Sequence, residues 1–242
     1  MKALVFEGPG RLMLRDWPVP RVGPGEVLLR VHTATICGTD LRIVSGRKTR
    51  DVRIGHPIGH ECCGTVAAVG DGVEAFTAGE RVAVHPVVTC GQCEHCTTDR
   101  ENLCPERITL GYHTDGAFAQ YMLVPARAVG RGNLFKLPAE ASLDVASVLE
   151  PAGCCINGQH EMGLMGGRQP PPASLLVIGA GPIGLLHVML ARAMHPKMPI
   201  TVLEPRERRR TAAEEVATGV RAADPQEFEA REAFDAVILA TG

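Results

Sequence analysis

Residues 174–184 read SLLVIGAGPIG, and this stretch decides the class of fold. An apolar run typical of a buried β-strand leads into three glycines, and an apolar helix-forming segment follows as far as about His195. Glycine at this spacing permits a tight turn and lets backbone N–H groups approach a pyrophosphate closely. The stretch therefore predicts a dinucleotide-binding turn formed by Gly179, Gly181, Pro182, Ile183 and Gly184.

The segments after this turn continue to alternate between strand and helix. A second apolar strand, PITVLE, ends in Glu204, and a charged helix, a short strand near Val220 and an apolar strand over residues 234–240 follow. Such alternation is typical of a parallel sheet with crossover helices. A complete doubly wound domain has about six strands. We therefore expect only the N-terminal part of a Rossmann domain.

Glu204 bears on the choice of dinucleotide. It lies twenty residues beyond Gly184, where a carboxylate accepts hydrogen bonds from the adenosine ribose and repels a 2′-phosphate. Four arginines follow it and offer the alternative of phosphate binding: Arg206, Arg208, Arg209 and Arg210. Charged runs of this kind are more often the solvated start of a helix. The sequence therefore favours NAD over NADP.

The residues before the turn have a different pattern. As far as about residue 140, short β-like runs are separated by Gly, Pro and Asp turns, and a helical stretch then extends from Ala141 to about Leu164. The segment GGRQPPPAS, residues 166–174, contains three successive prolines, which exclude a helix or a central strand. We expect two domains, a β-rich one over residues 1–149 and an α/β one over residues 150–242.

Composition narrows the classes of partner. The 242 residues are 45% hydrophobic and 21% charged, with a formal net charge of -2 and no long run of one sign, which argues against nucleic-acid and membrane surfaces. The start, MKALVFEGPG, reads as a strand rather than a signal peptide, and the apolar run over residues 175–193 is interrupted by Gly and Pro. A cytoplasmic protein with a small-molecule partner is expected.

Four of the nine cysteines form one cluster. Cys90, Cys93, Cys96 and Cys104 follow the pattern CxxCxxCx7C, in which short loops can place four thiolates around one tetrahedral Zn²⁺. Disulfides and an iron–sulfur cluster are the alternatives, but an odd total of cysteines without an export signal argues for metal ligation. The spacing predicts a structural zinc site.

A second group of residues indicates a metal site only when its members are considered together. Cys37 lies in CGTD, His60 and Glu61 lie in GHE, and Glu150 lies in LEP. Each alone is more often an ordinary core or surface residue. In this order, around the cysteine cluster and before GAGPIG, the motifs resemble those of the zinc-dependent medium-chain dehydrogenase/reductase family, particularly its sorbitol, threonine and polyol dehydrogenase branch. The resemblance extends over nearly the whole chain.

The resemblance implies a GroES-like catalytic domain joined to a Rossmann domain. By position, Cys37 and His60 match ligands of a catalytic zinc, and Glu150 matches the third ligand of this branch. Glu61 matches a residue that is a ligand in some members and lies behind the ligands in others. Asp40 matches the carboxylate that orients the ligand histidine, and Thr39 matches the hydroxyl that relays the alcohol proton. Together with the cysteine cluster, this implies two Zn²⁺ ions per chain.

The sequence departs from the family at Arg42, where a relay histidine is usual. Arginine does not deprotonate in proteins, so it does not shuttle a proton. The relay then ends at water or at another residue, or Arg42 binds an anionic group of the substrate or cofactor. Cys154, one turn beyond Glu150, is a weaker candidate ligand.

The resulting hypothesis is a zinc-dependent oxidoreductase that transfers hydride between NAD and a secondary alcohol, namely a polyol, sugar alcohol or cyclitol. A 3-hydroxy amino acid such as threonine is the alternative substrate. A second hypothesis is a truncated, catalytically incomplete zinc-binding remnant, because the chain ends at Gly242 before the remaining strands. That early end also disfavours a homo-oligomer. A zinc-independent quinone-reductase relative is disfavoured by Cys37, His60 and Glu150.

Overall fold

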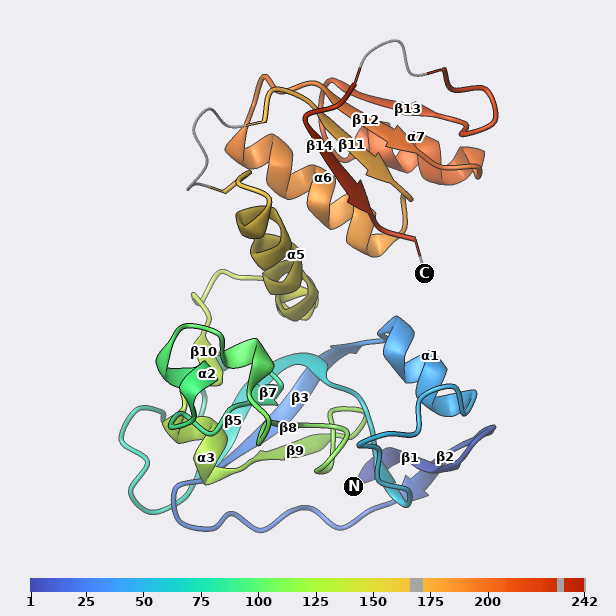
Figure 1. The fold of residues 1–242 in the computed structure, drawn as a ribbon. Coiled ribbons are helices and arrows are strands. Elements are labelled where there is room, and N and C mark those ends of the chain that lie inside the picture. Colours follow the sequence, from blue (N-terminus) through green and yellow to red (C-terminus); the bar gives the residue numbers. More distant parts are fainter. Residues whose placement is uncertain (166–171, 230–232, 242) are drawn as a thin grey trace. The chain divides into compact units, whose positions relative to one another are not determined.

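The computed structural model describes residues 1–165, 172–229 and 233–241. The chain divides into two compact units, Met1–Glu150 and Pro151–Gly242 (Figure 1). Each unit has its own hydrophobic core. Most of the proline-rich segment 166–174 lies outside the described residues. Among the described residues, no helix has the length and apolar character needed to cross a membrane.

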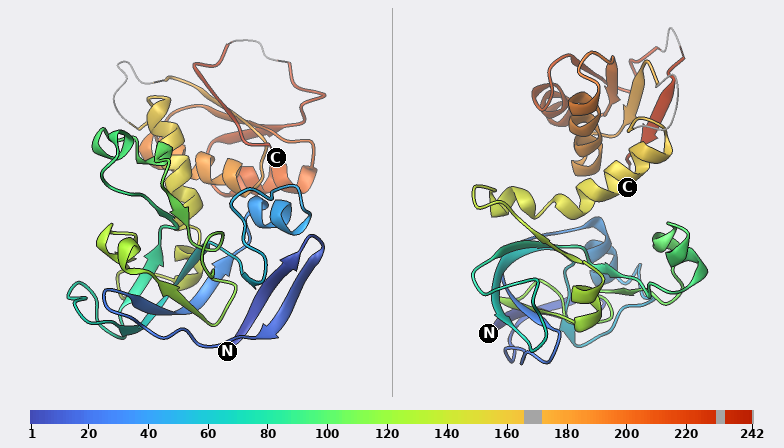
Figure 2. Two further views of the ribbon diagram at one scale, coloured as in Figure 1. Left: turned by 60° about the horizontal axis from the view of Figure 1, so that its bottom comes forward. Right: turned by 90° about the vertical axis from the view of Figure 1, so that its left-hand side faces the viewer.

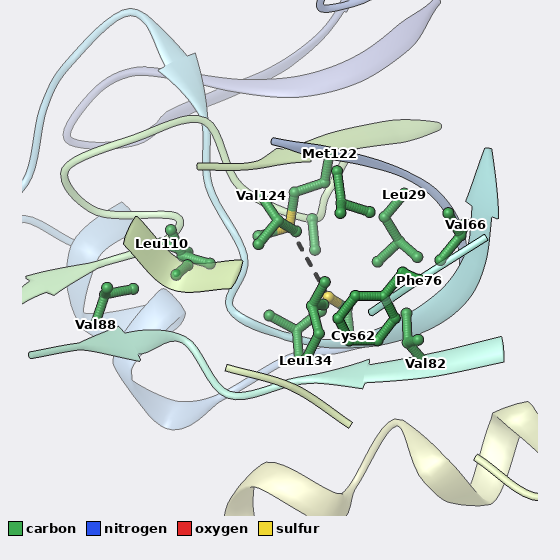
Figure 3. Close-up of a cluster of buried hydrophobic side chains, with 14 residues drawn as sticks. Leu29, Cys62, Val66, Phe76, Val82, Val88, Leu110, Met122, Val124 and Leu134 are labelled. Atoms are coloured by element: carbon green, nitrogen blue, oxygen red, sulfur yellow. Dashed lines mark hydrogen bonds between the residues drawn. The ribbon is translucent and has the colours of Figure 1, made fainter. Parts of the chain in front are cut away.

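The first unit is built around an antiparallel five-stranded sheet with the order β10-β6-β5-β3-β9. Its strands are β3 (Val27–Thr35), β5 (Glu61–Val69), β6 (Arg81–Val84), β9 (Tyr121–Val124) and β10 (Leu134–Lys136). Alternate apolar residues of these strands meet on one side, where Leu29, Val66 and Met122 are fully or almost fully buried (Figure 3). This core is the rigid base of the first unit.

Smaller elements surround this sheet. A second sheet has the order β2-β1-β4, from β1 (Lys2–Gly8), β2 (Arg11–Asp16) and β4 (His56–Pro57), and β7 (Val87–Val88) pairs with β8 (Ile108–Thr109). The helices of the unit are short: α1 (Gly38–Val44), α2 (Glu94–Thr97), the 3-10 turn η1 (Glu101–Leu103), α3 (Ala126–Gly130) and α4 (Leu143–Ala146).

The second unit contains a four-stranded parallel sheet with the order β13-β12-β11-β14. The strands are β11 (Leu175–Ile178), β12 (Ile200–Leu203), β13 (Val220–Ala223) and β14 (Ala236–Leu239). Helices α6 (Pro182–Met194) and α7 (Glu207–Glu215) connect successive strands and lie on the same face of the sheet (Figure 2). Right-handed crossovers that advance in one direction place their helices in this way. The sequence prediction of a parallel sheet with crossover helices is confirmed.

The helical stretch expected from Ala141 to about Leu164 consists of two helices. Helix α4 ends at Ala146, and α5 (Leu149–Glu161) begins after Ser147 and Val148. The Ser147 hydroxyl donates a 2.6 Å hydrogen bond to the Asp144 carbonyl, a local bond of the kind that competes with continued helix. Glu150 therefore lies in the first turn of a new helix.

Candidate metal centres and cofactor turn

Cys37 is positioned by the start of α1. It is the N-cap of the helix and has extended backbone angles, and its sulfur accepts a 3.4 Å hydrogen bond from the Thr39 N–H. The Asp40 carboxylate accepts a 2.9 Å hydrogen bond from the Cys37 N–H. These reciprocal bonds form a capping box. The motif CGTD thus holds the thiol, the Thr39 hydroxyl and the Asp40 carboxylate in one turn.

His60 faces this turn from the residue before β5. Its Nδ1 lies 3.3 Å from Oδ1 of Asp40, and its Nε2 lies 3.4 Å from the Tyr112 hydroxyl. His60 and Asp40 are both buried. Burial alone lowers the pKa of an imidazole, but Asp40 and Cys37 outweigh it and raise the pKa of His60 to about 10. An imidazole held through Nδ1 by a carboxylate presents Nε2 for ligation.

Glu61 completes a group of three candidate ligands. One ligand atom each from Cys37, His60 and Glu61 lies within 4.8 Å of the others. Glu61 is buried, and its carboxylate accepts a hydrogen bond from the Thr35 hydroxyl on the neighbouring strand. One thiolate, one imidazole and one carboxylate form a donor set that suits Zn²⁺ and leaves a fourth position for substrate. The donor atoms of this chain therefore fit the metal.

Glu150 and Cys154 are not in this group among the described residues. Glu150 is close enough for its charge to act on Tyr112, whose pKa is raised by burial and by nearby negative groups. Cys154 is exposed on α5. The roles of Glu61 and Glu150 as alternative third ligands remain predictions.

The four-cysteine cluster is assembled as the spacing predicts. The sulfur atoms of Cys90, Cys93, Cys96 and Cys104 lie within 4.8 Å of one another. Cys96 lies 3.5 Å from Cys93 and 3.8 Å from Cys90, measured between sulfurs. Thiolates around one tetrahedral Zn²⁺, with Zn–S bonds of about 2.3 Å, are about 3.8 Å apart. All nine cysteines are free thiols in this structure.

The environment favours the thiolate form at Cys90 but not at Cys93, because burial and the sulfurs of Cys90, Cys96 and Cys104 raise the pKa of Cys93 to about 12. Backbone N–H groups of Gln92 and Cys93 lower the pKa of Cys90 to about 6. The Cys90 N–H also points to Cys104, with 3.4 Å between nitrogen and sulfur. Since the thiolate is the form that binds metal, the N–H groups that lower the pKa of Cys90 favour metal binding by this residue.

The glycine-rich turn joins β11 to α6. Gly179 has a φ of +102°, and a side chain at Gly184 would place its Cβ 1.9 Å from the Gly179 carbonyl oxygen. These two glycines are required by the turn itself. Gly181 is the N-cap of α6, and Pro182 follows at the first helical position. A Cβ added at Gly181 would meet no atom of the described residues within 4 Å, so space is left there for a ligand.

Glu204 lies where β12 ends, and it is 4% exposed. Its carboxylate accepts hydrogen bonds from the N–H groups of Ala180, at 3.0 Å, and Arg206, at 3.1 Å. Burial opposes ionisation of Glu204, but these bonds and Arg209, 3.7 Å away, hold its pKa below the ordinary value. The Glu204 carboxylate thus links the end of β12 to the glycine-rich turn. Its remaining oxygen lone pairs can accept hydrogen bonds from the hydroxyl groups of a ribose.

A basic cavity next to Thr39 was only partly foreseen in the sequence. Its volume is about 550 Å³, and it is lined by Thr39, Arg42, Arg47, Lys48, Thr49, Arg50 and Tyr112. Arg42 was singled out because it replaces a usual histidine. The run GRKTR that begins at Gly46 was a possible signal for the other cations. Nothing near Tyr112 in the sequence points to His60, because the contact joins residues far apart in the chain.

Comparison with known proteins agrees with these observations. Residues 23–138 match the alcohol dehydrogenase GroES-like domain. L-threonine 3-dehydrogenase of Francisella tularensis subsp. holarctica is 39% identical over 196 residues, which are 79% of this chain and 53% of that protein. The chain spans about half the length of the curated relatives that it matches.

Solved structures show the same combination of domains. A structure from Sinorhizobium meliloti 1021, described as a zinc-binding dehydrogenase bound to NADP, superposes with a TM-score of 0.84 at 32% identity, covering 94% of this chain and 63% of that one. Galactitol-1-phosphate dehydrogenase from Escherichia coli superposes with a TM-score of 0.81 at 26% identity, covering 95% and 62%. With its GroES-like domain and the first part of a Rossmann domain, the chain belongs to the medium-chain dehydrogenase/reductase family.

Proposed function

We propose that this chain belongs to a zinc-dependent oxidoreductase that transfers hydride between a secondary alcohol and NAD. The observation that carries the proposal is the group Cys37, His60 and Glu61, within 4.8 Å of one another and next to Thr39 and Asp40. In this proposal, residues 1–149 form the catalytic domain and residues 150–242 the first part of the NAD-binding domain. A cytoplasmic location and a small-molecule alcohol partner belong to the same proposal.

Each residue of the centre has a distinct task. A bound Zn²⁺ supplies Lewis acidity toward the alcohol oxygen, and a bound nicotinamide ring supplies the hydride acceptor. Cys37 and His60 hold the metal, with Glu61 or Glu150 as third ligand. Asp40 orients the His60 ring, and the Thr39 hydroxyl accepts the alcohol proton and passes it outward. Arg42 stays protonated, so the proton leaves through water or another group.

The four-cysteine cluster holds a second, structural Zn²⁺ in this proposal. Its sulfur separations of 3.5 and 3.8 Å suit one tetrahedral ion and are short for thiolates that surround a cluster of several irons. This ion fixes the loop that contains α2 and η1.

NAD is the proposed dinucleotide, supported by Glu204. Two of the four arginines behind it already have partners: Arg210 pairs with Asp224 at 3.2 Å, and Arg209 lies 3.7 Å from Glu204. A 2′-phosphate would have to approach the Glu204 carboxylate, which repels it. The S. meliloti relative binds NADP, so the choice needs a direct test.

The substrate class is a polyol, sugar alcohol or cyclitol, and threonine is the alternative. The structural relative that acts on galactitol 1-phosphate supports a polyol, and the threonine 3-dehydrogenase relatives support the amino acid.

Metal analysis and calorimetry test the proposal. The purified chain is expected to contain about two zinc ions and to bind NAD⁺ more tightly than NADP⁺. Cys37→Ser and Cys93→Ser should each remove about one zinc, and Glu61→Gln compared with Glu150→Gln identifies the third ligand. Two zinc ions without NAD⁺ binding would contradict the assigned dinucleotide, and absence of zinc in the wild-type chain would overturn the proposed function.

A further inference from the structure

Four cations gather around the cavity next to Thr39. Arg42 lies in the last turn of α1, and Arg47, Lys48 and Arg50 follow in the loop after it. The remaining lining residues are Thr39, Thr49 and Tyr112, so the described lining contains three hydroxyl groups and no carboxylate. The concentration of like charge makes the positive potential of this cavity attractive to an anion.

Arg47 and Lys48 are held by neutral groups rather than by carboxylates. The Arg47 Nε donates to the Ser45 hydroxyl at 3.1 Å. The Lys48 ammonium donates to the Arg50 carbonyl at 3.1 Å and lies 5.1 Å from the centre of the Tyr112 ring. Within the described residues, Arg42, Arg47 and Lys48 form no salt bridge, and Arg50 has only an exposed contact with Asp51 at 3.7 Å. Their charge is therefore available to a ligand.

The cavity adjoins the candidate catalytic centre within the same unit. Thr39 lines it and donates its backbone N–H to Cys37. Tyr112 lines it and has its hydroxyl 3.4 Å from His60 Nε2. A molecule whose alcohol group reaches Cys37 and His60 can therefore place its remaining atoms in the cavity that Arg42, Arg47 and Lys48 line.

We propose that this cavity binds a phosphate group of the substrate, so that the enzyme acts on a phosphorylated alcohol. The inference rests on the proposed function and narrows its substrate class. Four cations and three hydroxyls offer more hydrogen-bond donors and more positive charge than one carboxylate can satisfy. A phosphate has more acceptor oxygens and up to two negative charges. Free threonine matches these cations less well, because it offers a single carboxylate and also carries an ammonium group that they repel. The dinucleotide is the other source of phosphate, and its pyrophosphate already has the turn at Gly181.

The test compares ligands that differ by one phosphate on the zinc-loaded chain. Titration calorimetry is run with D-sorbitol 6-phosphate, D-sorbitol, inorganic phosphate and NAD⁺. The wild-type chain is expected to bind sorbitol 6-phosphate at least about tenfold more tightly than sorbitol, with inorganic phosphate as a competitor. Equal affinity for the two sugars would overturn the proposal.

Variants then assign the effect to the cavity. Arg47→Gln with Lys48→Gln should weaken sorbitol 6-phosphate binding by at least about tenfold and leave NAD⁺ affinity unchanged, whereas Lys48→Arg should retain binding. Arg21→Gln is the matched control, since Arg21 is an exposed cation of the same unit outside the cavity. If the double variant loses NAD⁺ affinity and keeps the sugar phosphate, the cations serve the dinucleotide and the proposal is wrong.

Different measurements test the oxidoreductase function and the phosphate-binding cavity. The zinc content and the NAD⁺ titration report on the oxidoreductase function, and neither depends on the phosphate of the sugar. The ratio of affinities for sorbitol 6-phosphate and sorbitol reports on the cavity alone and needs no turnover. Circular dichroism of each variant confirms that the comparison is made on folded protein.

Discussion

At the scale of single residues, Glu204 shows how one buried carboxylate can serve the fold before any ligand binds. It accepts hydrogen bonds from two backbone N–H groups, one of them in the turn after β11. Burying the charge costs free energy, and the two bonds offset that cost. The residue therefore links the end of β12 to the glycine-rich turn.

Replacing Glu204 by Gln should make the stability of the second unit less dependent on pH. The folded pKa of Glu204 lies below its ordinary value of 4.5, so its stabilisation is present above that pH and is lost as the pH falls through the folded pKa. The variant should be less stable by about 1–2 kcal/mol at pH 7, and the difference should shrink in acid. Thermal melts at pH 7 and pH 4 measure this.

Glu215→Gln is the matched control, because Glu215 is exposed near the end of α7. Its melts should follow those of the wild-type chain at both pH values. A Glu204→Gln deficit that is as large at pH 4 as at pH 7 would mean that packing, rather than charge, accounts for the loss.

At the scale of elements, the glycines of the turn from β11 to α6 have different roles. Gly179 and Gly184 are needed for folding, whereas Gly181 leaves space for a ligand. Gly184→Ala should destabilise the second unit by about 1–3 kcal/mol, because its Cβ would meet the Gly179 carbonyl. Gly181→Ala has open space and should keep the fold while weakening NAD⁺ binding. Denaturant unfolding and calorimetry distinguish the two, and equal stability of both variants would contradict the assignment.

The loop that contains α2 and η1 is expected to depend on the proposed structural zinc for its stability. It has little buried apolar surface, since neither α2 nor η1 has a buried residue. Cys93→Ser should therefore lower zinc content by about one equivalent and loosen this loop. Cys63→Ser is the control, because Cys63 lies in a separate cluster and donates to the Leu143 carbonyl, a bond that a hydroxyl can also make. Unchanged zinc in Cys93→Ser would refute the site.

At the scale of the whole molecule, the two units have separate cores, and a disturbance in one need not spread to the other. Removal of zinc by a chelator should increase hydrogen exchange in α2, η1 and the residues around Cys37 while β11 and β12 keep their protection. Exchange measured by mass spectrometry on the intact chain checks this. Uniform loss of protection in both units would show that they unfold together.

Local patterns explain why much of this organisation could be predicted. The parallel sheet after residue 174 follows from apolar strands, a glycine-rich turn and helices in succession, and the cysteine cluster follows from short spacing, because a loop of a few residues has few ways to close. The break between α4 and α5 was missed, since it depends on a bond of the Ser147 hydroxyl rather than on periodicity.

The sequence by itself determined the strand–turn–helix order, the position of Glu204 after β12 and the set of four thiols, because each depends on neighbours along the chain. Only the tertiary structure decided that Glu61 lies with Cys37 and His60, that Tyr112 contacts His60, and that several cations face the cavity at Thr39. These groups come from segments joined by the pairing of β3 with β5 and by loops between sheets. Their proximity is set by packing, which spacing along the chain does not encode.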